Sequence, residues 1–137
     1  MKEPFEMYCA DSRWLIWEKG WEKSNLGVWE SIFTLGNGYI GSRGIYEEIP
    51  LGCSPGTFLA GVYDATGAQV TEMVNIPNPF DFRIVAEGEK IDITAMDVLF
   101  HRRVLDLSKG LLARKTIFSN SRKERFNYQS LRFWSMR

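Results

Sequence analysis

Apolar and polar residues alternate in short runs along most of the chain, and turn residues separate the runs. Successive side chains of a β-strand point to opposite faces, so this alternation predicts strands. β-Branched and aromatic residues, which favour strands, are concentrated in the same runs. We therefore predict an all-β fold with strands at Trp14–Glu18, Glu30–Leu35, Tyr39–Glu47, Thr57–Asp64, Val70–Asn75, Phe82–Ala86, Lys90–Ile93, Val98–Leu107, Leu111–Ser119 and Phe126–Met136.

The residues between the runs carry turn chemistry. Glu87-Gly88-Glu89 predicts a tight hairpin, because glycine adopts a positive φ without steric cost. Asp106 and Gly110 predict a second reversal, in which the aspartate side chain accepts hydrogen bonds from backbone amides. The polar segment 17–28 predicts a loop or a single helical turn.

Domain organisation follows from the order of these runs. The chain contains no linker-like composition and no repeat of fixed period, so residues 1–137 are predicted to form a single domain. The last run, from Ser130 to Met136, alternates as a strand to the end of the sequence. We expect a sheet that normally continues beyond it, and therefore an incomplete domain.

Charge and composition narrow the classes of function. Lys plus Arg and Asp plus Glu each number 17, so the formal net charge is zero and no nucleic-acid partner is expected. No segment approaches the ~20 consecutive apolar residues of a membrane-spanning helix, so no membrane partner is expected. Cys9 and Cys53 follow no secretory leader, which predicts reduced thiols in a cytoplasmic protein.

Gly36, Gly38 and Gly41 have the spacing of a dinucleotide-binding fingerprint. That motif requires a helix after the glycines, whereas Ile45–Glu48 continues as an extended run and Pro50 blocks a helix. The segment is better interpreted as a hairpin centred on Asn37-Gly38. No cofactor is predicted.

Two other features carry candidate chemistry. Glu47 and Glu48 are adjacent, and on a strand they would point to opposite faces, so they could not flank one glycosidic bond. We expect one exposed and one paired acid at a strand end, although either could contact a ligand or another domain. His101 has no partner at metal-ligand spacing, so no metal site is predicted and His101 is expected to point outward from a strand.

A series of motifs occurs in a specific order, namely Trp14–Glu18, Glu30–Phe33, Leu35–Gly41, Arg43-Gly44, Glu47-Glu48, Pro55–Tyr63, Asn75–Pro77, Leu105–Leu107, Gly110–Arg114 and Arg132–Met136. Together they resemble the amino-terminal domain of glycoside hydrolase family 65. That family includes maltose, trehalose and kojibiose phosphorylases and related trehalases. The resemblance runs from about Trp14 to the last residue.

The resemblance implies an antiparallel β-sandwich that precedes an (α/α)6-barrel, and a parent enzyme that cleaves an α-linked glucosyl disaccharide with phosphate. In the family the catalytic glutamate and the phosphate site lie in the barrel. No position here matches a catalytic residue, so we expect this chain to be inactive alone. Which disaccharide the parent cleaves, and whether it is a phosphorylase or a hydrolase, stay open at this point.

The resemblance also suggests a role for the glycine-rich hairpin. Glycines let a backbone approach another surface closely, so we expect Asn37, Tyr39, Arg43 and Glu47 to face the barrel or a ligand. The alternative function is a stand-alone carbohydrate-binding β-sandwich module, since aromatic residues stack on sugars. Open strand edges and apolar faces further predict a homo-oligomer.

Overall fold

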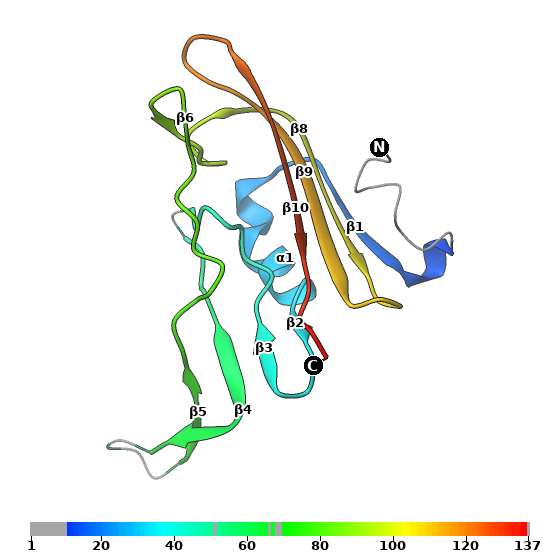
Figure 1. Cartoon of the computed structure of the whole chain (residues 1–137), viewed down its shortest axis with the longest axis vertical. Coiled ribbons are helices and arrows are strands. Elements are labelled where there is room, and N and C mark those ends of the chain that lie inside the picture. Colours follow the sequence, from blue (N-terminus) through cyan, green and yellow to red (C-terminus); the bar gives the residue numbers. More distant parts are fainter. Residues whose placement is uncertain (1–10, 51, 66, 68–69, 137) are drawn as a thin grey trace.

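The computed structural model describes residues 11–50, 52–65, 67 and 70–136 (Figure 1). One α-helix, α1 (Leu26–Ile32), follows the first strand, and two short 3₁₀ turns occupy Ser12–Trp14 and Lys23–Asn25. The strands are β1 (Leu15–Lys19), β2 (Leu35–Gly36), β3 (Ile40–Ser42), β4 (Thr57–Asp64), β5 (Glu72–Asn75), β6 (Val85–Ala86), β7 (Glu89–Lys90), β8 (Asp97–Asp106), β9 (Leu111–Ser119) and β10 (Arg125–Arg132).

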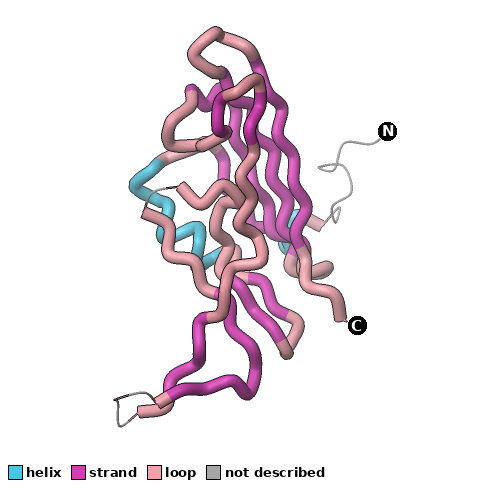
Figure 2. The backbone as a smooth tube through the Cα atoms, turned by 60° about the vertical axis from the view of Figure 1, so that its left-hand side comes forward, coloured by secondary structure: helices cyan, strands magenta, loops and turns pink. Residues whose placement is uncertain are grey.

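The strands form antiparallel sheets, which confirms the prediction of an all-β fold. Sheet A has the order β1-β8-β9-β10, sheet B has the order β2-β3-β4-β5, and β6 and β7 form a separate hairpin. The long loops that precede β4 and β8 lie beside one face of sheet A (Figure 2). Three adjacent strands of sheet A have eight to ten residues each, whereas in sheet B only β4 reaches eight residues.

The register of sheet A places a row of polar side chains across all four strands, and three of these side chains are charged. Glu18 lies opposite Arg103, Arg103 opposite Arg114, and Arg114 opposite Ser130. Side chains two residues apart on a strand share a face, so the neighbouring rows also point into the molecule. These rows are Ile16, Leu105, Leu112 and Arg132 on one side and His101, Thr116 and Tyr128 on the other.

Two apolar clusters flank this polar row. One contains Phe33, Leu35, Leu105 and Leu112, and the other contains Leu26, Tyr46, Ile91, Ile93 and Phe118. Both clusters combine sheet A with residues from α1 or from the loops. The core of this domain is therefore two apolar layers separated by a layer of buried charge.

The predicted strand Glu30–Leu35 is wrong. Residues 26–32 form α1, which buries Leu26 and Glu30 four residues apart, and Phe33 follows at its C-cap with no exposed surface. Residues three and four apart share a helix face, and this spacing overrides the β-branched content of the run. Only Leu35-Gly36 pairs as a strand.

The predicted strand Tyr39–Glu47 is also too long. β3 ends at Ser42, and residues 43–48 leave sheet B and cross the inner face of sheet A. We call residues 43–48 the crossing segment. The other predicted strands are present, several of them shorter, and the hairpin glycine Gly88 has φ 80° as expected.

Gly44 is the point of closest approach between the crossing segment and α1. Its amide donates to the Glu30 carbonyl at 2.8 Å, and a Cβ added at Gly44 would lie 2.3 Å from the Cβ of Phe33. We expect Gly44→Ala to lower the free energy of unfolding by about 2 kcal/mol or more, because the backbone must move apart. Urea unfolding measures this.

Gly27→Ala is the matched control, because Gly27 lies in α1 and an added Cβ would meet nothing within 4 Å. Alanine is the better helix former, so this variant should be neutral or slightly more stable. Equal stability of both variants would contradict the close approach.

Candidate functional site

A network of buried charged side chains joins the crossing segment to sheet A. At one end, the Nε of Arg103 donates to Glu18 at 2.5 Å, and its Nη1 donates to the carbonyl of Gly44 at 2.8 Å. The hydroxyl of Tyr46 donates to Glu18 at 3.1 Å. All three side chains are buried. The ion pair thus joins β1 to β8, and hydrogen bonds with the Gly44 carbonyl and the Tyr46 hydroxyl tie this pair to the crossing segment.

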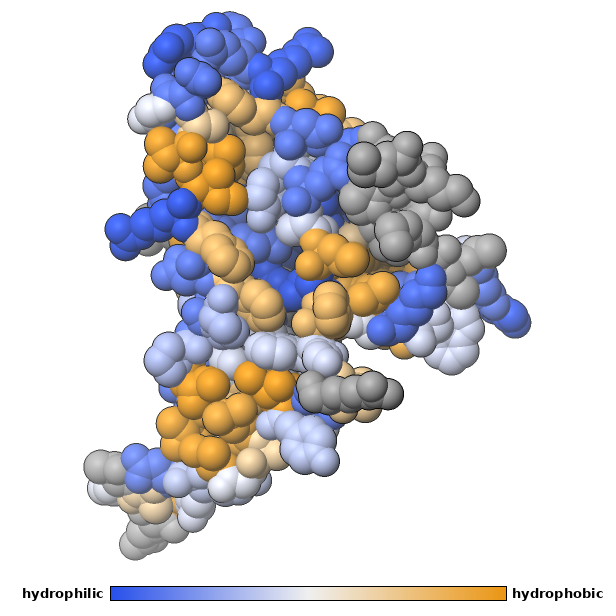
Figure 3. Space-filling view, viewed as in Figure 1, coloured by the Kyte–Doolittle hydropathy of each residue, from blue (hydrophilic) through white to orange (hydrophobic). Residues whose placement is uncertain are grey.

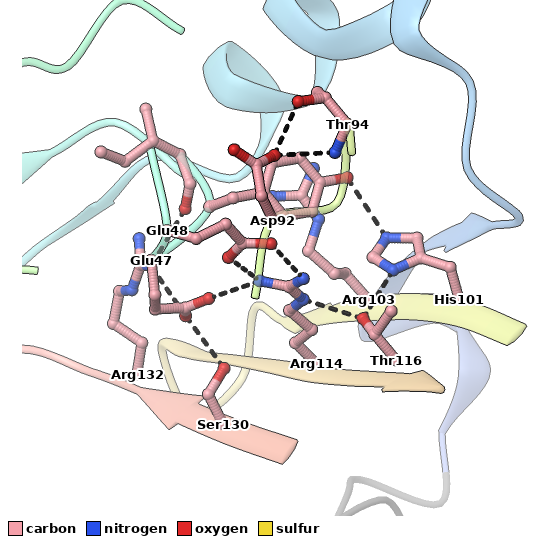
Figure 4. Close-up of polar contacts among 12 residues, drawn as sticks. Glu47, Glu48, Asp92, Thr94, His101, Arg103, Arg114, Thr116, Ser130 and Arg132 are labelled. Carbon is pink, nitrogen blue, oxygen red and sulfur yellow. Dashed lines mark hydrogen bonds and ion pairs between the residues drawn. The ribbon is translucent and has the colours of Figure 1, made fainter. Parts of the chain in front are cut away.

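Arg114 forms the centre of the network (Figure 4). Its two terminal nitrogens donate to Glu48 at 2.6 and 2.7 Å, and Nη1 also donates to Glu47 at 2.9 Å. Its Nε donates to the hydroxyl of Thr116 at 2.9 Å. This bidentate geometry matches the planar guanidinium to the carboxylate and is the stronger kind of charge-assisted hydrogen bond.

Arg132 and Ser130 complete the network from β10. Arg132 Nη2 donates to Glu47 at 2.8 Å and to the carbonyl of Ile45 at 3.0 Å, and Ser130 donates to Glu47 at 2.9 Å. Glu47 therefore accepts hydrogen bonds from two strands. The expectation of one exposed and one paired acid is wrong, because residues 47 and 48 lie in a turn and both carboxylates reach Arg114.

His101 is buried, which contradicts its expected outward position. Its ring nitrogens contact Thr116 at 2.8 Å and Glu18 at 3.2 Å, and Tyr46 lies 3.2 Å from Nε2. Parity explains the difference, because His101 and Arg103 share the inner face of β8. Burial lowers the pKa of His101, although the hydrogen bond to Glu18 opposes this shift.

Aromatic rings cover the guanidinium planes. Arg103 lies 4.8 Å from the ring centroid of Phe33 and 3.9 Å from that of Tyr46. Arg114 lies 4.7 Å from the ring of Tyr46, and Arg132 lies 4.4 Å from the ring of Phe80. The ring faces interact favourably with the cations. The three arginines are thus held by carboxylates in their plane and by rings above it.

The electrostatics of the network favour fully charged partners. Burial would raise the pKa of Glu47, but Arg114 and Arg132 outweigh it and lower that pKa to about 2. Burial opposes ionisation of Glu18 as well, and His101 and Arg103 nevertheless hold its pKa below the usual value. Burial raises the pKa of Tyr46. A carboxyl with such a low pKa carries no proton to donate near neutral pH, so the network is suited to holding structure rather than to acid–base catalysis.

The four residues expected at an interface occupy three environments. Tyr39 is 76% exposed, and it lies with Arg43 on a groove in sheet B. Asn37 stabilises the hairpin through the amides of Tyr39 and Ile40, and its Nδ2 donates to the Ser135 carbonyl at 2.6 Å. Glu47 belongs to the buried network. The structure brings Tyr39 and Arg43 together on the groove, keeps Asn37 in the adjoining hairpin without lining the groove, and places Glu47 in a separate buried network.

The groove that carries Tyr39 and Arg43 has a volume of about 480 Å³ and a largely apolar lining. Apolar surface gathers over this part of the molecule (Figure 3). Its lining consists of Thr34, Gly36, Gly38, Tyr39, Ile40, Gly41, Ser42, Arg43, Phe58, Ala60 and Met73. No Asp or Glu is among these residues. Arg43 is the charged member, and it donates to buried Glu30 at 3.3 Å.

The groove therefore offers an apolar surface without a carboxylate, and the buried network offers carboxylates without a free acid. No group of His, Cys, Asp and Glu that could hold a metal ion occurs among the described residues. Cys53 is a free thiol, and burial raises its pKa, whereas Cys9 lies outside the described residues. No helix in the described part of the chain is long and apolar enough to span a membrane.

The sequence and the fold both match a known family. Residues 16–137 match the family model described as "Glycosyl hydrolase family 65, N-terminal domain". The chain belongs to this family.

Several relatives of this family 65 domain are named as disaccharide phosphorylases. Kojibiose phosphorylase of Caldanaerobacter subterraneus subsp. tengcongensis is 37% identical over 130 residues, which cover 95% of this chain and 17% of that protein. Nigerose phosphorylase of Lachnoclostridium phytofermentans is 32% identical over 124 residues, which cover 90% of this chain and 16% of that protein.

A solved structure, "Putative kojibiose phosphorylase from human microbiome", aligns with a TM-score of 0.71 at 30% identity and covers 79% of this chain and 16% of that chain. The family 65 domain described here thus spans about a sixth of the length of such relatives.

The low pKa values of the network predict sensitivity to acid. Glu47 has a folded pKa of about 2 against about 4.3 when unfolded, so its stabilisation is present above pH 4.3 and is lost as the pH falls toward 2. His101 also has a lowered pKa, so the unfolded state binds protons first below about pH 6.5. We expect urea-unfolding free energies to fall from pH 7 to pH 3, with about 2 kcal/mol of the loss due to Glu47.

Glu47→Gln identifies the contribution of this carboxylate. The variant should be less stable at pH 7 and should show a flatter dependence on pH below about 4.5. A wild-type profile that stays flat between pH 7 and pH 3 would contradict the charged state of the network.

Proposed function

We propose that this chain is the non-catalytic N-terminal domain of a phosphorylase that cleaves an α-linked glucosyl disaccharide with phosphate. Kojibiose is the first substrate to test, since two of the relatives named above carry that activity in their names. Trehalose, nigerose and maltose are the further candidates. In this proposal the domain acts as a scaffold, and the reaction takes place in a part that corresponds to the unmatched length of the relatives.

One observation supports a non-catalytic role above all. Cleavage of a glycosidic bond requires a carboxyl group that can donate a proton beside a substrate-sized pocket. The groove of about 480 Å³ has no Asp or Glu in its lining. The carboxylates buried in the network accept hydrogen bonds from arginine, and Glu30 accepts one from Arg43. A smaller pocket of about 170 Å³ does include two acids, but Asp97 pairs with Lys123 and Glu89 accepts a hydrogen bond from Ser121.

An activity assay tests the proposal directly. The 137-residue chain and the longer polypeptide that carries it are incubated with kojibiose, nigerose, trehalose or maltose and inorganic phosphate, and released glucose 1-phosphate is measured. We expect release by the longer polypeptide and none by the chain. Phosphorolysis by the purified chain would overturn the scaffold role, and a longer polypeptide inactive on all four sugars would overturn the phosphorylase assignment.

The groove is proposed as the face that meets the rest of the phosphorylase polypeptide, with Tyr39 and Arg43 on its surface and Asn37 and Glu47 holding it from within. Support comes from its apolar lining and from Tyr39 and Met73, which are 76% and 47% exposed. Glycines at 36, 38 and 41 leave the floor free of Cβ atoms, which permits close approach.

Substitution in the longer polypeptide tests this face. Tyr39→Ala and Arg43→Ala should each lower the thermal midpoint and phosphorolysis rate of the longer polypeptide, while Tyr39→Ala should leave the midpoint of the 137-residue chain nearly unchanged. Tyr63→Ala is the control, because Tyr63 is 57% exposed on β4 and does not line the groove. Equal effects of Tyr39→Ala and Tyr63→Ala would reject the interface.

A stand-alone carbohydrate-binding module is the alternative, favoured by the exposed ring of Tyr39 beside the groove. Titration of the chain with the same disaccharides separates the two, because the scaffold proposal expects no binding in the groove.

The exposed apolar residues also support our proposal that the isolated chain forms a homo-oligomer, which light scattering on these samples measures. Free Cys53 supports a cytoplasmic location.

A further inference from the structure

A second cleft lies at the end of β1 and differs from the apolar groove in its lining. Its volume is about 310 Å³, and its lining includes Lys19, Trp21, Phe100 and Arg102 but no Asp or Glu. It therefore combines two cations with two aromatic rings. This composition is unusual in a chain whose formal net charge is zero.

The two cations are placed unfavourably in the sheet. Lys19 on β1 lies directly opposite Arg102 on β8 in the antiparallel register. Like charges at directly opposite positions destabilise a pair of strands. The guanidinium of Arg102 lies 5.5 Å from the ring centroids of both Trp17 and Phe100, and its buried Nε has no acceptor among the described residues. The cost of this arrangement is removed when an anion lies between the two cations.

The backbone leaves room for a ligand at this place. β1 ends at Lys19 and pairs with Arg102–Asp106, so no strand among the described residues pairs with residues 97–101 of β8 on the β1 side. Gly20 turns the chain away with φ 85°, and its amide donates to the carbonyl of His101 at 3.0 Å. The register of β8 shifts between Val98 and Phe100, and such bulges re-aim side chains beside binding sites.

We propose that this cleft binds a phosphate group carried on a sugar ring, that is, a phosphorylated monosaccharide. A phosphate dianion satisfies both cations, and the planar guanidinium of Arg102 can donate two parallel hydrogen bonds to it. The rings of Trp21 and Phe100 supply flat apolar surface for the attached sugar, and the volume is sufficient for a small ligand. The proposal rests on the cleft alone and does not depend on the function proposed above.

Isothermal titration of the 137-residue chain with glucose 1-phosphate, inorganic phosphate and glucose tests the ligand class. We expect glucose 1-phosphate to bind more tightly than inorganic phosphate, binding of both to weaken with added salt, and glucose to bind at least about tenfold more weakly. Equal affinity for the two phosphates would overturn the sugar contact. The site would be overturned if glucose bound as tightly as glucose 1-phosphate, or if none of the three probes bound.

Four variants identify the residues. Arg102→Gln should weaken binding of glucose 1-phosphate by about tenfold, and Arg102→Lys should weaken it less, because the charge remains. Lys23→Gln, the matched control, removes an exposed charge outside the cleft and should change nothing. Lys19→Gln should weaken binding but raise the unfolding midpoint without ligand, since it removes the like-charge pair.

This opposite response of binding and stability is not expected of a merely structural lysine. Unchanged affinity in Arg102→Gln, or a lowered midpoint in Lys19→Gln, would contradict the proposal. If the chain does not fold alone, the ligand-induced rise in thermal midpoint is compared between Arg102→Gln and Lys23→Gln in the longer polypeptide. Ligand bound at a catalytic site elsewhere would raise the thermal midpoint of Arg102→Gln and Lys23→Gln by the same amount. An equal rise in the two variants would therefore also contradict binding in the cleft.

Discussion

The ion pairs between the crossing segment and sheet A are the interactions on which the rest of this domain depends. Glu47 and Glu48 of the crossing segment pair with guanidiniums of β9 and β10. Glu18 of β1 pairs with Arg103 of β8, which also donates to the Gly44 carbonyl of the crossing segment. Charge inside a protein is tolerated only when it is paired and hydrogen-bonded, so each group depends on the others. The network fixes where residues 43–48 lie, and these residues connect sheet B to sheet A.

Buried ion pairs contribute less to stability than their number suggests, because desolvation offsets most of the attraction. Their value here is better described as specificity. An apolar layer between the two clusters would let the crossing segment slide, whereas the bidentate contact of Arg114 with Glu48 allows one position. The aromatic rings on the guanidiniums add to this restriction, since Tyr46 touches both Arg103 and Arg114.

The sequence predicts the long strands of sheet A well, because the alternation of apolar and polar residues in 98–107, 111–119 and 126–132 continues over several two-residue repeats. It fails at α1, where seven residues are too few for helical periodicity to stand out, and the burial of Leu26 and Glu30 is decided by tertiary contacts.

The network could have been found only in part. Parity places His101 and Arg103 on one face of β8, but the sequence does not show which face is inward, and the expectation that His101 points outward is wrong. Glu47 and Glu48 could not be assigned to their arginine partners, because residues 47 and 48 leave the strand that the pattern predicts.

The contacts that hold the crossing segment join residues far apart in the chain. Arg103 and Gly44 are 59 positions apart, Arg114 and Glu48 are 66 apart, and Arg132 and Glu47 are 85 apart. Closing such large loops costs entropy before any contact forms, so topologies of this kind fold slowly. The strands that supply the guanidiniums are also synthesised after all three glutamates. The glutamates are therefore synthesised first and stay solvated until the arginines follow. The contacts between the crossing segment and sheet A can be completed only after β10 has emerged.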